Sequence, residues 1–301
     1  MSNTLNLPNA IIAGAPKCGT TSLFNYLADH PEVCPARVKE TKYLIDPGYP
    51  LYDEKCNYQS GGLSGYESFF AHCEDRHKIR LEATPDYIYQ EAPLRCLTAF
   101  QQPPAIIFIL RKPSERIYSL FRFAQNNMAI LPPKMTFQEF LYLLETKDAG
   151  FEKRTILKNA IQHSHYSFYI KRWIQALGKE NIHTFLFEEM VADQSKFIKK
   201  VCTLLGIEAS FYDKYHPKRD NETISIRNQT IQRFKNKISD YIPEGAFKAV
   251  LKNINTAINV RKAKSPKSPE DLLALDKLNL EFRSEVDELQ KLTGIQPDGW
   301  R

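Results

Sequence analysis

Long apolar runs are missing from this 301-residue sequence. The longest are short, such as residues 105–110, whereas a membrane-spanning helix needs about 20 consecutive apolar residues. Residues 1–9 are polar and lack the basic stretch and following apolar segment of a secretory signal. We therefore expect a cytoplasmic protein with no transmembrane segment.

Metal-binding and disulfide patterns are also missing. The six cysteines show no C-x-x-C spacing: Cys18, Cys34, Cys56, Cys73, Cys96 and Cys202. The sequence therefore predicts reduced thiols and no zinc site. His163 and His165 are two residues apart, which would place them on different faces of a helix, so they do not predict a metal pair.

The formal net charge of +6 is modest and dispersed along the chain. It suits an anionic ligand but does not indicate nucleic-acid binding. The chain is 43% hydrophobic and 25% charged, as is usual for a globular protein, and contains no low-complexity tract. It is long enough to bury a substantial core.

Short apolar segments alternate with helical patterns along the chain. Buried strands are predicted at residues 10–13, 79–83, 105–110 and 182–187, and helices at 21–28, 91–100, 113–125, 160–177 and 195–205. Residues 128–155 form a predicted helical excursion around 137–144, and 217–301 a loop-rich C-terminal part with a terminal helix near 280–292. This order predicts an α/β fold: a single P-loop-like domain over 1–301, built as a three-layer sandwich with a mostly parallel central sheet between helices.

A candidate phosphate-binding loop lies between the first predicted strand and helix. Its residues are Gly14, Ala15, Pro16, Lys17, Cys18, Gly19, Thr20, Thr21 and Ser22. Glycines let the backbone approach an anion closely, the first N–H groups of the helix point toward it, and the helix dipole favours negative charge. The hydroxyl groups can donate further hydrogen bonds.

The loop differs from that of nucleotide triphosphatases. The spacing G-x-x-x-x-G is present, but Thr20 stands where the lysine should follow, and Lys17 lies inside the loop instead. The strand at 105–110 continues into Arg111 rather than a magnesium-binding aspartate. A kinase-like enzyme using ATP and magnesium is therefore the disfavoured alternative. A cysteine phosphatase is disfavoured too, because Phe24 stands where its arginine is required.

Residues 15–23 resemble the 5′-phosphosulfate loop of sulfotransferases that use 3′-phosphoadenosine-5′-phosphosulfate (PAPS), and residues 109–119 resemble the second signature of that family. The similarity continues through 185–190 and 292–300. It implies PAPS as co-substrate, without a metal, and 3′-phosphoadenosine-5′-phosphate (PAP) as product. The implied donor-binding residues are Pro16, Lys17, Cys18, Gly19, Thr20, Thr21, Ser22, Arg111 and Ser119, the last two converging on the 3′-phosphate.

The resemblance also implies a reaction centre. Lys17 would stabilise the leaving phosphate, and Glu40, in a stretch similar to the K-E-x-H pattern of heparan sulfate and bacterial sulfotransferases, would be the base. Lys42 stands where the family usually has histidine. Glu82 is the second candidate base. Ala83 replaces a lysine common in heparan-modifying members, which argues against a heparan-like acceptor.

Some residues outside the two signatures are also given roles by the sequence. Arg116 and Arg122 are expected on a solvated helix face, and Tyr166 in packing. The segment 217–227 is a candidate for closing over the 3′-phosphate. A non-catalytic nucleotide-binding protein is the remaining alternative. Neither the acceptor, among small molecules, sugars and lipids, nor the oligomeric state follows from the sequence.

Overall fold

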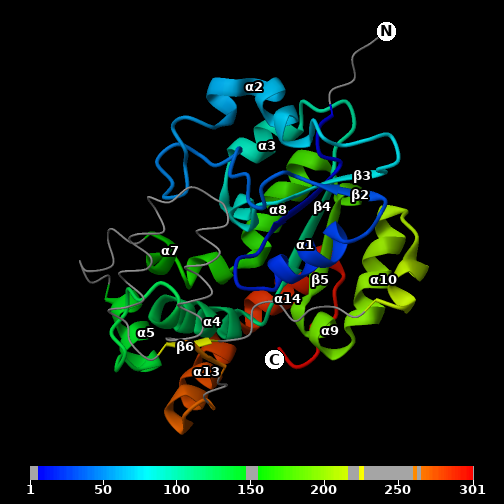
Figure 1. The fold of residues 1–301 in the computed structure, drawn as a ribbon. Coiled ribbons are helices and arrows are strands. Elements are labelled where there is room, and N and C mark those ends of the chain that lie inside the picture. The colour runs from blue at the N-terminus through cyan, green and yellow to red at the C-terminus, as the bar shows by residue number, and fades with distance from the viewer. Residues whose placement is uncertain (1–5, 147–154, 216–223, 227–259, 263–265, 301) are drawn as a thin grey trace. The chain divides into compact units, whose positions relative to one another are not determined.

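A computed structural model describes residues 6–146, 155–215, 224–226, 260–262 and 266–300 (Figure 1). The chain divides into two compact units. The first comprises Met1–Lys112, His165–Lys218 and Phe282–Arg301, and the second comprises Pro113–Ser164 and Arg219–Glu281. The single domain expected from the sequence stays a prediction.

A five-stranded sheet forms the centre of the first unit. Its strands are β1 (Ala10–Gly14), β2 (Val33–Pro35), β3 (Ile79–Ala83), β4 (Ala105–Leu110) and β5 (Ile182–Leu186). They lie in the order β2-β3-β1-β4-β5, and every pair is parallel. Strand β1 is completely buried between β3 and β4, as a central strand of a parallel sheet should be. The predicted α/β fold is confirmed.

Helices of the first unit flank this sheet (Figure 1). They are α1 (Thr20–Ala28), α2 (Tyr58–Glu67), α3 (Ala92–Leu97), α8 (Tyr166–Leu177), α9 (Phe187–Ala192), α10 (Gln194–Leu205) and α14 (Arg283–Thr293). Short 3₁₀ helices also occur: η1 (Ser68–Phe70), η2 (Pro85–Tyr89), η4 (Lys179–Asn181) and η5 (Ala209–Asp213).

Helices α8 and α10 cover opposite faces of the sheet. Phe108 of β4 packs edge-on against Trp173 of α8, with 5.4 Å between ring centroids. Phe185 of β5 packs against Phe197 of α10 at 5.5 Å. Because Phe185 is in register with Ile109 and side chains alternate along a strand, Phe108 and Phe185 point to opposite faces. Because side chains alternate between the two faces of the sheet, a helix packs on each face, and the three layers result.

The second unit is built around α4 (Pro113–Asn126), which follows β4 directly in the chain. Its other described elements are α5 (Phe137–Glu145), α7 (Thr155–Lys158), η3 (Gln162–Ser164), α13 (Pro269–Glu281) and the antiparallel pair β6 (Ile224–Ile226) and β7 (Val260–Lys262). Phe121 of α4 packs against Phe137 and Phe140 of α5, with centroids 5.5 and 5.4 Å apart.

Most element bounds agree with the sequence prediction, with some differences. The helix predicted over 160–177 begins at Tyr166, after η3, and the strand predicted over 182–187 ends at Leu186, where α9 begins. Elements β2, α2, α9 and α13 were not predicted.

A disulfide joins Cys34 of β2 to Cys73, with Cα atoms 5.7 Å apart. The expectation of reduced thiols throughout is therefore wrong for these two cysteines. The Arg37 backbone N–H donates to the Phe69 carbonyl oxygen at 3.1 Å, which draws two distant segments together. No local cysteine motif could reveal this, because 39 positions separate the pair.

Replacing both bonded cysteines, Cys34→Ser with Cys73→Ser, should lower the free energy of unfolding by about 2–4 kcal/mol, because the unfolded chain regains the entropy of an open loop. Urea denaturation measures the change. Cys56→Ser, at an exposed free cysteine, is the matched control and should shift stability by less than about 0.5 kcal/mol. A double variant as stable as the wild type under oxidising conditions would contradict this role.

Candidate functional site

The candidate phosphate-binding loop lies at the carboxyl end of β1, where the chain turns into α1. Lys17 and Gly19 both have positive φ angles, 72° and 87°. The first helical hydrogen bond runs from the Leu23 N–H to the Gly19 carbonyl oxygen, 3.2 Å. The N–H groups of the turn before it have no helical acceptor, and no side chain caps this helix. The turn therefore presents backbone donors to an anion.

All seven residues predicted from the first signature belong to this turn. They are Pro16, Lys17, Cys18, Gly19, Thr20, Thr21 and Ser22. The side chains of Lys17 and Thr21 are half-buried, whereas Cys18 is completely buried. Cys18 is thus packed inside the protein, whereas the side chain of Lys17 is partly accessible.

Helix α9 supports the loop from the protein side. A Cβ atom on Gly19 would lie 2.8 Å from the Phe187 ring and still closer to the Met190 methyl group. Phe187 also lies under Arg111, whose guanidinium carbon is 4.9 Å from the ring centroid. One aromatic ring of α9 therefore contacts the loop and the cation that follows β4.

Tyr166, at the start of α8, links the two signatures. Its hydroxyl donates to the Arg111 carbonyl oxygen at 2.9 Å and lies 3.7 Å from the Cys18 sulfur. The residue is completely buried, so the packing role predicted for it is confirmed. The polar link was not predicted, because α8 is remote in sequence from both partners.

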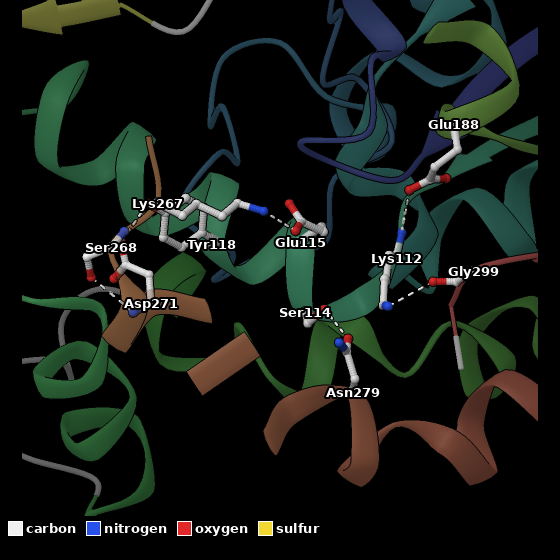
Figure 2. A network of polar contacts seen from close by, with 10 residues as sticks. All are labelled: Lys112, Ser114, Glu115, Tyr118, Glu188, Lys267, Ser268, Asp271, Asn279 and Gly299. Carbon is white, nitrogen blue, oxygen red and sulfur yellow. Dashed lines mark hydrogen bonds and ion pairs between the residues drawn. The ribbon is translucent and has the colours of Figure 1, made fainter. Parts of the chain in front are cut away.

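Lys112 secures the residues after β4 (Figure 2). Its backbone N–H donates to Glu188 Oε1 at 3.1 Å, and its ammonium donates to the Gly299 carbonyl oxygen at 2.8 Å. The neighbouring Trp300 is 2% exposed, with its ring centroid 6.4 Å from that of Tyr166. The C-terminal residues therefore help to fix the segment that carries Arg111.

Ser119, predicted with Arg111, lies on α4 in the second unit and is half-buried. Contacts with α13 and the residues before it fix this helix within its unit (Figure 2). Ser114 donates to Asn279 Oδ1 at 2.6 Å, and Tyr118 donates to Asp271 Oδ2 at 3.0 Å. Lys267 pairs with Glu115 and lies over the Tyr118 ring.

The solvated position expected for Arg116 is wrong. Arg116 is 2% exposed, and its guanidinium donates to Ser164 Oγ at 3.0 Å and to the Ala160 carbonyl oxygen at 2.8 Å. Arg122 is half-buried and donates to Gln125 Oε1 at 3.0 Å. A helical pattern alone does not reveal Arg116's burial, because its acceptors come from a segment some 45 residues later.

Glu40 lies in the loop that follows β2, in the same unit as the phosphate-binding loop. Its backbone is left-handed, with φ 62°, and so is that of Lys42, with φ 57°. Its carboxylate pairs with the Lys39 ammonium at 2.6 Å, yet the side chain remains 36% exposed. Lys39 also lies 6.0 Å from the ring centroid of Phe24 in α1. Glu40 is therefore held and still accessible.

Glu82, the second candidate base, is completely buried at the end of β3. Oε1 accepts from the Thr41 hydroxyl at 2.7 Å and from the Thr84 hydroxyl at 2.8 Å, and Oε2 accepts from the Tyr66 hydroxyl. Burial raises the pKa of Glu82, and these hydrogen bonds oppose that rise. A carboxylate with both oxygens occupied inside the protein cannot reach an external hydroxyl.

Other features considered in the sequence are an aromatic-rich stretch, the segment 217–227, metal ligands and membrane-spanning helices. Tyr66 and Phe70, in the aromatic-rich stretch 43–70, are completely buried and pack in the core. The segment 217–227 lies outside the described residues, apart from the backbone of 224–226. Of the described side chains, Cys34, His72 and Cys73 have metal-ligand spacing, but the two sulfurs are bonded to each other. No helix in the described ranges could span a membrane.

Known proteins resemble this chain in sequence and fold. Residues 7–242 match the family model described as "Sulfotransferase domain". Heparan sulfate glucosamine 3-O-sulfotransferase 3B1 of Homo sapiens is 25% identical over 215 residues, which cover 71% of this chain and 50% of that protein. Bifunctional heparan sulfate N-deacetylase/N-sulfotransferase 1 of Mus musculus is 23% identical over 211 residues, covering 67% and 22%.

A crystal structure of a sulfotransferase from Alicyclobacillus acidocaldarius superposes with a TM-score of 0.66 and 19% identity, over 98% of each chain. That likeness supports the fold. The chain spans half or less of the length of the two curated relatives.

The close approach at Gly19 predicts a steric cost for a side chain there. Gly19→Ala should lower the free energy of unfolding by about 1 kcal/mol for the left-handed backbone and by about 1–3 kcal/mol more for overpacking against Phe187. Gly206→Ala is the matched control, because Gly206 has φ 66° but no atom within 4 Å of an added Cβ. Urea unfolding of both variants measures the difference, and equal losses would contradict a packed loop.

Proposed function

The chain belongs to the sulfotransferase family, and we propose that it transfers a sulfuryl group from PAPS to a hydroxyl or amine of a small-molecule, carbohydrate or lipid acceptor. The observation that carries the proposal is the phosphate-binding loop at the start of α1, with Lys17 at its centre, in the same unit as the accessible carboxylate of Glu40.

The loop supplies what the 5′-phosphosulfate of PAPS requires. Backbone N–H groups of the first turn of α1 and the hydroxyls of Thr20, Thr21 and Ser22 are donors for its oxygens. Arg111 provides a planar fork of donors for the 3′-phosphate. Its carbonyl is fixed by Tyr166, and its guanidinium rests on Phe187. The role of Ser119 at the same phosphate stays a prediction from the sequence resemblance.

The transfer needs a base and a group that stabilises the leaving phosphate. Glu40 takes the proton of the acceptor hydroxyl as its oxygen forms a bond to sulfur. The bond between sulfur and the bridging oxygen breaks, and its electron pair remains on the 5′-phosphate of PAP. Lys17 is a compact cation suited to stabilise that charge. These donors and cations hold the leaving group without requiring a metal ion.

The chemical class of the acceptor is the part of the reaction that still has to be identified. The two curated relatives carry the names of heparan sulfate enzymes. In this chain Ala83 ends β3, where heparan-modifying members tend to have lysine. We therefore do not extend the heparan acceptor to this chain. Transfer from labelled PAPS to a phenol, a glucosamine oligosaccharide and a hydroxylated lipid would identify the class.

Calorimetry with PAP and with ATP plus magnesium distinguishes this function from the kinase-like alternative. We expect PAP to bind without a metal and at least about tenfold more tightly than ATP with magnesium, a difference of about 1.4 kcal/mol. The 3′-phosphate has a partner in Arg111, whereas Thr20 stands at the lysine position of a triphosphate loop. Tighter binding of ATP with magnesium would contradict the proposal.

Turnover of a Glu40→Gln variant tests the base and also the non-catalytic alternative. The amide cannot accept the proton, so we expect turnover of labelled PAPS to fall about 10²–10⁴-fold, with the Kd for PAP nearly unchanged. Glu54→Gln, at an exposed glutamate, makes the same chemical change elsewhere and should leave turnover intact. If Glu40→Gln retained full turnover, Glu40 would not be the base, and a wild type without turnover would favour the non-catalytic alternative.

A further inference from the structure

Within the part of the chain that the structure describes, no cation hydrogen-bonds to Glu82, although it is a completely buried carboxyl group. Burying a charge without pairing it is costly, so its surroundings call for an explanation. Its described hydrogen-bond partners are hydroxyl groups: Thr41 from the loop after β2, Tyr66 from α2, and Thr84 and Tyr87 from the segment after β3. Three separate segments thus converge on one carboxylate.

In these hydrogen bonds the hydroxyls of Thr41, Tyr66 and Thr84 donate and the oxygens of Glu82 accept. Because a hydroxyl has one proton, each of the three can only accept at its other contacts. The Thr41 hydroxyl donates its proton to Oε1 and also lies 3.2 Å from the Tyr87 hydroxyl, which hydrogen-bonds to Glu82 as well. The lone pairs of both hydroxyls can accept further donors.

The lone pairs that remain accept backbone N–H groups of the Glu40 loop. Thr84 Oγ1 accepts from the Lys42 N–H at 3.2 Å, and Thr41 Oγ1 accepts from the Tyr43 N–H at 3.3 Å. The Tyr87 hydroxyl accepts from the Leu44 N–H at 3.1 Å. Three consecutive backbone donors therefore depend on hydroxyls that hydrogen-bond to Glu82.

These bonds act at Lys42, the second of two left-handed residues of the loop, and directly after it. Glu40 and Lys42 have φ angles of 62° and 57°, a conformation that costs a non-glycine residue roughly 1–2 kcal/mol. Such a backbone persists where surrounding contacts over-determine it. The bonds to residues 42–44 and the inward hydroxyl of Thr41 supply those contacts, and they leave the Glu40 side chain outside the buried network.

We propose that Glu82 is a positioning residue for the sulfuryl-transfer reaction: it orients the hydroxyls of Thr41, Thr84 and Tyr87 so that they hold the loop in the conformation that presents Glu40 to the acceptor. This inference rests on the proposed function of Glu40. It also replaces Glu82's candidacy as the base itself with a role that acts through Glu40.

A double-mutant cycle between Thr41 and Glu40 tests the inference. Thr41→Val keeps the side-chain shape and removes the hydroxyl. We expect it to lower kcat about 10–10²-fold, the effect of misplacing a catalytic group by about 1 Å, with the Kd for PAP within about twofold. In a Glu40→Gln background the same substitution should lower kcat by less than about twofold further, because the group it positions is already gone.

Tyr66→Phe is the matched control, because the Tyr66 hydroxyl donates to the other oxygen, Oε2, and makes no hydrogen bond to residues 41–44 in the structure described. It should destabilise the fold but keep kcat within about threefold, while Thr41→Ser should restore most of the activity lost in Thr41→Val. PAP released from labelled PAPS is measured with the most active acceptor of the panel above, or with water where no acceptor is faster. Melting temperatures confirm that each variant is folded.

Two outcomes would overturn the positioning role. In the first, the fold-losses in kcat of Thr41→Val and Glu40→Gln multiply fully in the double variant. In the second, Tyr66→Phe lowers kcat as much as Thr41→Val does. If Thr41→Val does not fold, Thr84→Val, which removes the acceptor of the Lys42 N–H, enters the same cycle. Failure of the proposed function is separate, because it would appear as full activity of the Glu40→Gln variant alone.

Discussion

Parallel pairing of β1 with β3 on one side and β4 on the other is the constraint on which the first unit depends. In a parallel sheet every strand delivers its carboxyl end to the same edge. The phosphate-binding loop after β1, the Glu40 loop after β2, Thr84 after β3, Arg111 after β4 and helix α9 after β5 therefore all begin there. Residues scattered over about 170 positions become neighbours because their strands run in one direction.

Strands β3 and β4 could be predicted to the residue. Strand β4 is a short apolar segment between a proline and an arginine, and β3 alternates apolar residues with Arg80 and Glu82 before Thr84 and Pro85. Strand β2 could not, since Val33–Pro35 becomes a strand only through its pairing with β3. Helix α2 could not be predicted because it contains several glycines, which have poor helix propensity. Side chains at Gly61 and Gly65 would collide with the Tyr43 hydroxyl, so tertiary packing outweighs the poor helix propensity of glycine there.

The residues of the candidate site also divide into those that could be predicted from the sequence and those that could not. The loop from Pro16 to Ser22 could be recognised because all its residues are contiguous and act largely through backbone geometry. The partners of Glu82, the link made by Tyr166 and the burial of Arg116 could not, because each joins segments distant in sequence. A local sequence pattern can identify contiguous candidate ligand-binding residues. The residues that hold them in place come from distant segments, so they are identified only in the folded structure.

The Tyr166 hydroxyl ties together two segments of the first unit that are far apart in sequence. It contacts the Cys18 sulfur on one side and the Arg111 carbonyl on the other. Because a single oxygen atom makes both contacts, the loop after β1 and the residue after β4 cannot shift independently of the start of α8.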